Sequence, residues 1–407
     1  MGSMKNLIWP LVPGGAVVLV ALVCLRPGVL PASASPYVRA YPYVVFGVGT
    51  FLGWYFNRSR VVFALVVLAV ADRAWLTFGA GTAAETGLGR TVFDAVCLLL
   101  PLNLLAFSWI GERGVLTARG IWRLIAILLQ MLVIGTIVQV NWRILPAGLE
   151  YRAIDVRLTS WTPVAQPALA AFGAALISQA IRFVLRQDAI EAGFLWTLGV
   201  AFVGLHGISA GWDPTNFFAT AALVLVVALI ETSYRMAYHD DLTGLPGRRA
   251  LNEALLQLGS RYAVAMVDID HFKKFNDAYG HDVGDQVLRM VGSKLGRVTG
   301  GGRAFRYGGE EFSVIFPGKS AEEASTHLEA VRIMIAGSGF VLRGSDRPRK
   351  KPATPKVSHT PRKGVFVTVS IGLAERDSNQ IEPDHVVKAA DKALYRAKRA
   401  GRNRVMT

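Results

Sequence analysis

Two adjacent carboxylates lie at the tip of a predicted hairpin, in the stretch "FRYGGEEFSVIF". The apolar runs on either side of the tip predict two β-strands, and Gly308 and Gly309 permit a sharp turn between them. Glu310 and Glu311 follow the turn, where the backbone can approach a ligand closely. On this segment alone a solvated turn is the better explanation, so a functional interpretation depends on the motifs that accompany it.

A second pair of acidic residues, Asp268 and Asp270, ends the apolar run "YAVAMVDID", which predicts a buried strand. Ligand sites of α/β sheets tend to form at the carboxyl ends of strands, so the two acidic pairs converge if both segments belong to one sheet. Carboxylate oxygens suit Mg²⁺, which takes one or two carboxylates and leaves its other positions to water and substrate phosphates. The pattern therefore predicts a metal that is held against a nucleotide.

The elements that must position these residues follow one another as soluble α/β structure from about residue 240. Apolar periodicity and capping residues predict a strand, a helix, the hairpin, a helix, a strand and a closing helix, over residues 262–270, 284–298, 303–316, 320–337, 365–375 and 383–403. Residues 343–364 hold eight Lys or Arg against one Asp, with several prolines. This composition predicts a disordered basic insertion.

Five motifs occur in a fixed order along this half of the chain: "DDLTGLPGRRAL", "VDIDHFKKFNDAYGHDVGDQVLR", "RYGGEEF", "VSIGLA" and "ADKALYRAKRAGRNRV". The set resembles the GGDEF family, the diguanylate cyclases that condense two GTP into cyclic di-GMP, over roughly residues 240–407. The resemblance implies a GGDEF fold with a ferredoxin-like palm core, GTP as substrate and a homodimer. Gly247 departs from the family, which usually has an asparagine at that position of the turn.

The resemblance also implies roles for particular residues. It assigns the metal, Mg²⁺ with Mn²⁺ as the alternative, to the carboxylate of Asp268, the backbone carbonyl of Ile269 and Glu310, with Glu311 as a second ligand. Glu310 also matches the residue proposed to accept the proton of the attacking hydroxyl. The other matches are a transition-state residue, Lys273, three contacts to guanine or substrate, Asn276, Asp285 and His281, and two phosphate clamps, Lys398 and Arg402.

Several of these residues also have a structural alternative. Asp285 is a suitable helix N-cap. Lys398 and Arg402 stand four apart in a predicted basic terminal helix, and such charges can form a solvated face. Asp270 fits a structural role better than a catalytic one.

A feedback site that many members of the family carry is missing from the sequence. The resemblance places its RxxD motif at Thr299–Gly302, with the aspartate six residues before Gly308, and the sequence there reads "TGGG". Thr and Gly side chains supply neither a guanidinium fork nor a carboxylate, although Arg297 and Arg303 flank the window. We therefore expect no inhibitory product site.

The composition of the whole chain indicates a membrane protein. Of its 407 residues 52% are hydrophobic, and the mean hydropathy of +0.37 is high for a soluble chain. The net charge of +15 is spread over both halves, with 16 basic and 10 acidic side chains in residues 1–235 and 28 and 19 in the rest. No nucleic-acid partner is predicted from this distribution. Cys24 and Cys97 lie in apolar runs without metal or disulfide spacing.

Residues 1–235 are predicted to form an integral membrane, sensor-like domain. Most of its apolar runs are near the ~20 residues that span a bilayer, which predicts about eight transmembrane helices, with six or seven as the alternative. The runs are residues 6–25, 40–56, 61–79, 91–110, 121–140, 162–181, 192–210 and 216–233. The last run continues into polar sequence without a break, which predicts a helix that leaves the bilayer. Because GTP is cytoplasmic, residues 236–407 are placed in the cytoplasm and the helices in a bacterial inner membrane.

Ionisable residues inside the apolar runs, Asp72, Asp94 and His206, are candidates for sensing, although a local pair with Arg73 explains the first of them. One membrane histidine cannot supply both axial ligands of a haem, so a bis-histidine haem sensor within one chain is disfavoured. The sequence identifies no sensory ligand. The prediction is a membrane-bound diguanylate cyclase regulated by its membrane domain. The alternatives are an inactive GGDEF domain that serves as a nucleotide receptor, and a transporter with a regulatory tail.

Overall fold

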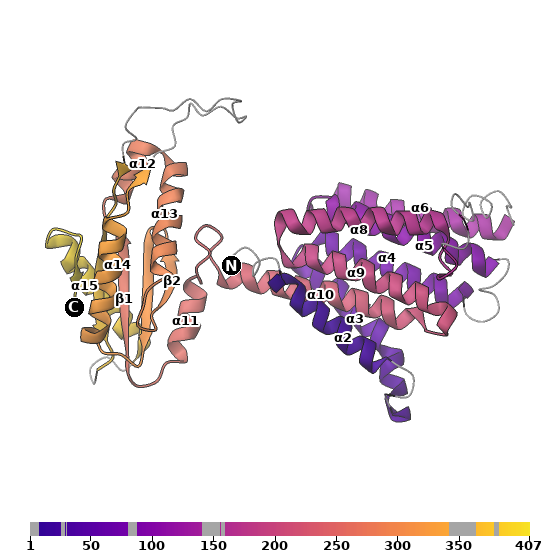
Figure 1. Cartoon of the computed structure of the whole chain (residues 1–407), viewed down its shortest axis with the longest axis horizontal. Helices are drawn as coiled ribbons and strands as arrows, with labels where there is room; N and C mark the ends of the chain where they lie inside the picture. Colours follow the sequence, from indigo (N-terminus) through magenta and orange to yellow (C-terminus); the bar gives the residue numbers. More distant parts are fainter. Residues whose placement is uncertain are drawn as a thin grey trace. The chain divides into compact units, whose positions relative to one another are not determined.

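The computed structural model describes residues 8–25, 29, 31–79, 88–140, 155, 159–341, 364–377 and 382–407. The chain divides into two compact units, Met1–Ser233 and Tyr234–Thr407 (Figure 1). All but the last residue of the predicted basic insertion lies outside the described residues, so its disorder stays a prediction.

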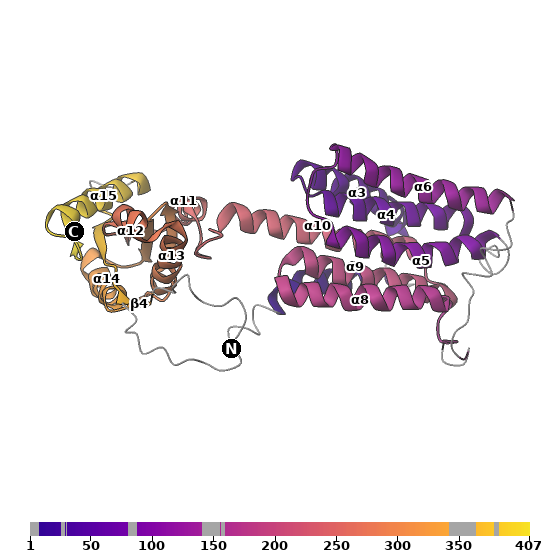
Figure 2. The ribbon, with the colours of Figure 1, turned by 90° about the horizontal axis from the view of Figure 1, so that it is seen from above.

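The first unit is a bundle of helices that lie side by side (Figures 1 and 2). Each of the eight predicted apolar runs contains a helix in the described part of the chain: α2 (Val12–Cys24), α3 (Ser35–Tyr55), α4 (Ser59–Ala74), α5 (Leu88–Trp109), α6 (Ala118–Val140), α8 (Gln166–Arg186), α9 (Ala189–His206) and α10 (Pro214–Tyr238). By length and hydropathy six of these described helices could cross a membrane, namely α4, α5, α6, α8, α9 and α10. The predicted number of spans, about eight with six or seven as the alternative, stays a prediction.

The helices of the first unit share one apolar core. Phe63, Phe194 and Phe218, from α4, α9 and α10, are completely buried in it. These three helices are apolar on most of their faces, as expected for helices enclosed by others. As predicted, α10 continues without a break to Tyr238, and its side chains change from buried at Leu229 to half exposed at Ile230.

A buried cluster of charges joins α4, α8 and α9. Glu191 is fully buried, and its carboxylate accepts hydrogen bonds from Arg60 Nη2 at 2.9 Å and from Arg182 Nη2 at 2.6 Å and Nε at 3.0 Å. Asp188 caps α9 by accepting a hydrogen bond from the backbone N–H of Glu191. The carboxylate of Glu191 thus balances the charges of two buried guanidinium groups. Removal of Glu191 alone would leave two buried positive charges without a counter-charge.

The other ionisable residues of the apolar runs have local partners. Asp72 forms an ion pair with Arg73 at 2.5 Å, which confirms the local pairing expected from the sequence. Asp94 pairs with Arg90, one turn earlier on α5, at 3.0 Å. The ring of His206 stacks among aromatic side chains of the same unit.

The second unit is built on a five-stranded sheet of order β2-β3-β1-β6-β7. Its strands are β1 (Tyr262–Ile269), β2 (Arg303–Gly308), β3 (Glu311–Pro317), β6 (Val369–Glu375) and β7 (Val405–Met406), and a separate pair is formed by β4 (Phe340–Val341) and β5 (Gly364–Val365). The central strand β1 is antiparallel to both β3 and β6. The order β6-β1-β3-β2 is that of a βαββαβ ferredoxin-like core, as expected from the sequence.

Helices cover both faces of this sheet: α11 (Arg248–Leu256), α12 (Phe272–Tyr279), α13 (His281–Leu295), α14 (Ala321–Ala336) and α15 (Pro383–Arg399). Every residue of β1 is buried, because its side chains alternate between two cores. Val267 lies in the core that α13 and α14 also form, whereas Met266 packs with residues of α15. The predicted cap of α14 is present as a capping box between Ser320 and Glu323.

Candidate active site

The two acidic pairs of the sequence meet at one edge of the sheet. The strand register places Asp268, next to last in β1, opposite Glu311, the first residue of β3. Glu310 precedes it in the turn, where Gly309 adopts a φ of +53°, a conformation that favours glycine. Asp268 is buried and the two glutamates are half-buried. Three carboxylates are therefore gathered at one edge of the sheet, and one of them is shielded from solvent.

Electrostatics at this edge favours a cation. Burial raises the pKa of Asp268, although the hydrogen bond and charge of Lys398 oppose that effect. Burial also raises the pKa values of Glu310 and Glu311, and the nearby charge of Asp268 raises them further. Like charges on facing strands destabilise a sheet unless a cation balances them. The Nζ of Lys398 lies 2.8 Å from Asp268 Oδ2 and supplies part of that balance.

The donor set at this edge fits Mg²⁺. No group of three or more Asp, Glu, His or Cys side chains among the described residues could hold a metal ion by itself. Mg²⁺ commonly needs only one or two carboxylates, because water and substrate phosphates complete its coordination. Asp268 and Glu310 supply such carboxylates, and Ile269, the last residue of β1, supplies a backbone carbonyl.

The two predicted phosphate clamps differ in their surroundings. Lys398 lies in the last turn of α15 and is paired with Asp268, so a merely solvated face is the wrong interpretation for it. Arg402 does not share that helix, because α15 ends at Arg399 and Arg402 follows with a φ of +60°. The expectation of one basic helix through both residues is therefore wrong.

Asp270 has the structural role expected for it. Its carboxylate accepts hydrogen bonds from Thr368 Oγ1 at 2.6 Å, from Ser370 Oγ at 2.7 Å and from the backbone N–H of Asn403 at 3.1 Å. Both carboxylate oxygens are thereby engaged with the segments at β6 and β7. This carboxylate therefore links the end of β1 to β6 and to the segment before β7.

The predicted guanine contacts lie on consecutive helices. Asn276 is on α12 and Asp285 is inside α13, whose N-cap is Gly280, so the N-cap alternative for Asp285 is wrong. The Oδ1 atom of Asn276 is buried and has no hydrogen-bond partner among the described residues. A Cβ atom at Gly284 would lie 1.9 Å from this oxygen. Gly284, which the sequence analysis missed, therefore leaves the space that the carboxamide occupies.

Lys273 and His281 are exposed, on α12 and at the start of α13. The hydrogen bonds and ion pairs found among the described residues link neither of them to the acidic cluster. Their roles stay predictions that rest on the resemblance.

Arg306 connects the acidic turn to the start of the second unit. Its Nη1 donates to both carboxylate oxygens of Asp240 at 2.8 Å, while Nη2 and Nε donate to the carbonyl of Gly309 at 2.7 and 3.3 Å. Asp240 also accepts hydrogen bonds from the backbone and hydroxyl of Thr243. Burial alone would raise the pKa of Asp240, but the hydrogen bonds from Arg306 and Thr243 outweigh it and leave that pKa lowered.

Arg306 and Asp240 belong to two of the five sequence motifs, but the motifs predict no role for either residue. The sequence signal that could have indicated a role was the position of Arg306 on the predicted strand that leads into the Gly308–Gly309 turn. One guanidinium group fixes the carbonyl that immediately precedes Glu310, so Arg306 is a positioning residue of this site.

The comparison with known proteins identifies this unit. Residues 237–404 match the family model described as "Diguanylate cyclase, GGDEF domain". The second unit contains a GGDEF domain. Diguanylate cyclase DgcP of Pseudomonas aeruginosa is 36% identical to the chain over 184 residues, which are 43% of the chain and 25% of DgcP. Response regulator PleD of Caulobacter vibrioides is 35% identical over 185 residues, 44% of the chain and 37% of PleD.

A solved structure of a GGDEF domain also matches part of the chain. The GGDEF domain of DgcB from Caulobacter crescentus, crystallised in complex with c-di-GMP, is 37% identical, matches 42% of the chain and 95% of that domain, and gives a TM-score of 0.36. The chain spans less than half of the length of DgcP and of PleD.

Proposed function

We propose that the protein is a membrane-bound diguanylate cyclase that condenses two GTP into cyclic di-GMP and two pyrophosphate. The observation that carries the proposal is the arrangement of Asp268, Glu310 and Lys398 at one edge of the GGDEF sheet. Cyclases among the relatives support the reaction. Among the described residues, six helices that are long and apolar enough to cross a membrane support a bacterial inner-membrane location. A regulatory role of the first unit belongs to the same proposal.

Charge neutralisation and an oriented nucleophile are the main requirements of phosphoryl transfer. Asp268, the Ile269 carbonyl and Glu310 would hold Mg²⁺, which supplies charge neutralisation at the phosphates when bound. Glu310 accepts the proton of the attacking 3′ hydroxyl. The 3′ oxygen then bonds to the α-phosphorus of the other GTP, and the bond to the departing pyrophosphate breaks.

The remaining residues bind and discriminate the nucleotide. Lys398 leaves its ion pair with Asp268 and, with Arg402, binds the outer phosphates. The carboxylate of Asp285 accepts from the amino and N1–H edge of guanine, and the carboxamide of Asn276 lies beside it. Adenine would leave these polar groups unpaired, which favours GTP over ATP. Because each domain binds one GTP, two copies must face each other as a symmetric homodimer.

The direct test is to incubate the purified full-length protein with GTP and Mg²⁺ and to identify the product by mass. Cyclic di-GMP with two equivalents of pyrophosphate is the expected result. A protein that binds GTP without turnover would instead be a nucleotide receptor, and the proposal would be wrong.

Substitution of Gly284 by alanine is expected to weaken GTP binding. The new methyl group would lie 1.9 Å from Asn276 Oδ1 and would displace the carboxamide. Loss of one hydrogen bond to guanine should raise KM by about tenfold, with a smaller effect on kcat. Steady-state rates of the full-length protein over a range of GTP concentrations measure this change.

Two further variants show whether Gly284 acts through Asn276. Asn276→Ala should raise KM to a similar extent, and the double variant should be no worse than either single one, because the same interaction is lost. Gly259→Ala is the matched control, since a Cβ there meets nothing within 4 Å. An unchanged KM in Gly284→Ala would remove Gly284 from substrate binding.

Cyclic di-GMP is expected not to inhibit the enzyme as it accumulates. The Thr299–Gly302 loop holds no arginine or aspartate, and Thr299 Oγ1 is hydrogen-bonded to His327 Nδ1 at 2.8 Å. A Cβ at Gly300 would lie 2.2 Å from the same His327 ring, so this ring packs closely on the loop. Initial rates at rising product and calorimetric titration check the prediction. Submicromolar binding that disappears in Arg297→Ala or Arg303→Ala would show that an altered product site exists.

A further inference from the structure

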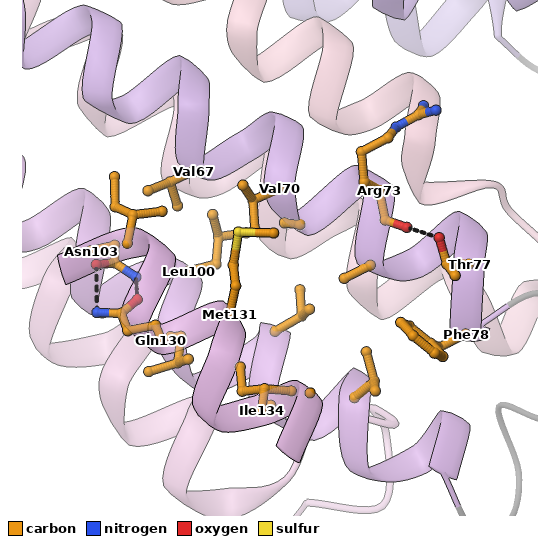
Figure 3. A pocket seen from close by; sticks show the side chains of 18 residues that line it. Val67, Val70, Arg73, Thr77, Phe78, Leu100, Asn103, Gln130, Met131 and Ile134 are labelled. Carbon is orange, nitrogen blue, oxygen red and sulfur yellow. Dashed lines mark hydrogen bonds between the residues drawn. The ribbon is translucent and has the colours of Figure 1, made fainter. Parts of the chain in front are cut away.

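A cavity of about 230 Å³ lies between α4, α5 and α6 in the first unit (Figure 3). Most of its wall is apolar, with contributions from Val67, Leu100, Met131 and Ile134. Its volume exceeds the roughly 150 Å³ of an apolar cavity that takes up benzene. The space therefore suits an apolar molecule larger than benzene.

A pair of carboxamides forms one end of this cavity. Asn103 Nδ2 donates to Gln130 Oε1 at 2.8 Å, and Gln130 Nε2 donates to Asn103 Oδ1 at 3.3 Å. Figure 3 shows the two side chains facing each other at the wall, on α5 and α6. Each carboxamide retains one N–H and one oxygen lone pair beyond this reciprocal pair. The pair can therefore bridge two helices and still hydrogen-bond a guest.

The charge near the cavity is directed away from it. Arg73 contributes to the wall, but Figure 3 shows its guanidinium group pointing outward. That group donates to Asp72 Oδ2 and to the hydroxyl of Tyr43. Within the described wall no other residue is charged. A charged guest would be buried without a counter-charge, so the cavity suits a neutral one.

Helix α6, which forms one wall of the cavity, is sparsely packed on the rest of the bundle. Only 11% of the apolar window of α6 is buried, against 50% in α4 and 61% in α5. A guest in the cavity would contact α6 and α4–α5 together and would add to their few shared contacts. Occupancy would therefore strengthen the packing of α6 on α4 and α5.

We propose that this cavity is a binding site for a small, neutral, membrane-soluble molecule that carries a carbonyl or hydroxyl group. The apolar part of the molecule lies between α4, α5 and α6, and its polar group hydrogen-bonds to the Asn103–Gln130 pair. The molecule enters from the bilayer, where its apolar part is soluble. The site lies in the first unit and not in the GGDEF domain. The inference rests on the proposed membrane location but does not depend on cyclase activity.

Photolabelling of the full-length protein in lipid nanodiscs tests the site, with benzophenone as the probe. Benzophenone is a neutral aromatic ketone that inserts into nearby C–H bonds on irradiation, and mass spectrometry maps the labelled residues. We expect saturable labelling at residues that line the cavity, such as Met131. Labelling that rises linearly with the probe and is spread over outward-facing residues such as Leu128 would overturn the proposal.

Two kinds of variant test the geometry. Ala95→Phe places a ring in the cavity and should abolish the saturable labelling, whereas Leu128→Phe, on the exposed face of α6, should not. Asn103→Leu combined with Gln130→Leu removes both carboxamides without leaving either unpaired, and should weaken labelling about fivefold. The unchanged labelling of that double variant would eliminate the polar contact even if Ala95→Phe failed to fold.

A matched pair of competitors tests the polar contact in the unaltered protein. Dicyclohexyl ketone and dicyclohexylmethane have nearly the same shape and differ by the carbonyl oxygen. Compared at equal concentration in the bilayer, the ketone should displace benzophenone about fivefold better, as expected for one hydrogen bond. Equal competition would show that the cavity takes up any apolar molecule, acyl chains included, and would overturn the assigned ligand class.

Discussion

Substitution of Glu310 by glutamine is expected to lower kcat by about a thousandfold, the range that a general base contributes to proton transfer. Glutamine has nearly the same size but cannot accept the proton of the 3′ hydroxyl, and it is a poorer ligand for Mg²⁺. The fold should survive, because Glu310 is half-buried in a turn and contributes no strand pairing. Single-turnover and steady-state rates with GTP and Mg²⁺ measure the loss.

Two controls separate the role of Glu310 from the general charge of the turn. Glu311→Gln removes the neighbouring carboxylate and should cost less, because Glu310 remains to accept the proton. Glu322→Gln removes an exposed carboxylate in the first turn of α14 and should leave the rate unchanged. Turnover near the wild-type level in Glu310→Gln would exclude this residue from the chemistry.

Substitution of Arg306 by lysine is expected to lower kcat by about a hundredfold, the cost of displacing a catalytic group by about 1 Å. The guanidinium group holds Asp240 with one nitrogen and the Gly309 carbonyl with two others. A lysine ammonium group keeps the charge but cannot span both partners in this planar geometry. The turn that carries Glu310 would lose its fixed position.

A purely structural role for Arg306 predicts a different result. Loss of positioning lowers kcat in proportion to the displacement, whereas loss of structure lowers the folded fraction and leaves the rate per folded molecule unchanged. Rates normalised to the folded fraction distinguish the two, with Arg303→Lys on the same strand as the control. Unchanged normalised rates in Arg306→Lys would contradict the positioning role.

The same contact predicts a pH dependence of stability. The pKa of Asp240 is lowered in the folded protein. The stabilisation of the fold by the Asp240 carboxylate is therefore complete above the unfolded pKa of about 3.9. It is lost as the pH falls from that value through the lower pKa of the folded protein. The difference in unfolding free energy between the wild type and Asp240→Asn should therefore shrink only in that acid range. Denaturant titrations at several pH values measure it.

Sequence reasoning succeeded where a local pattern determines the structure. The apolar run before Asp268 and the glycines before Glu310 predicted β1 and the β2–β3 hairpin, because alternation and turn chemistry act over a few residues. Ser320 likewise predicted the start of α14. These elements bring the acidic residues together once the strand order is known.

The contacts that sequence reasoning missed all depend on the tertiary fold. Arg306 and Asp240 are 66 residues apart, so their pairing cannot be inferred from either motif alone. The space at Gly284 is visible only when α12 and α13 are placed against each other. The end of α15 was misjudged because Gly401 and Arg402 adopt positive φ values that a charge pattern does not reveal.

The buried cluster of Glu191, Arg60 and Arg182 constrains how this protein can evolve. Loss of Glu191 alone would leave two buried arginines without a counter-charge and would lower the free energy of unfolding by about 3–5 kcal/mol. Replacing all three residues by well-packed apolar ones can leave that free energy unchanged. The path between these two sequences passes through unstable intermediates, since no single substitution reaches the apolar state. Descendants of this chain should therefore inherit the three residues together, and a lineage that lacks one should lack the others.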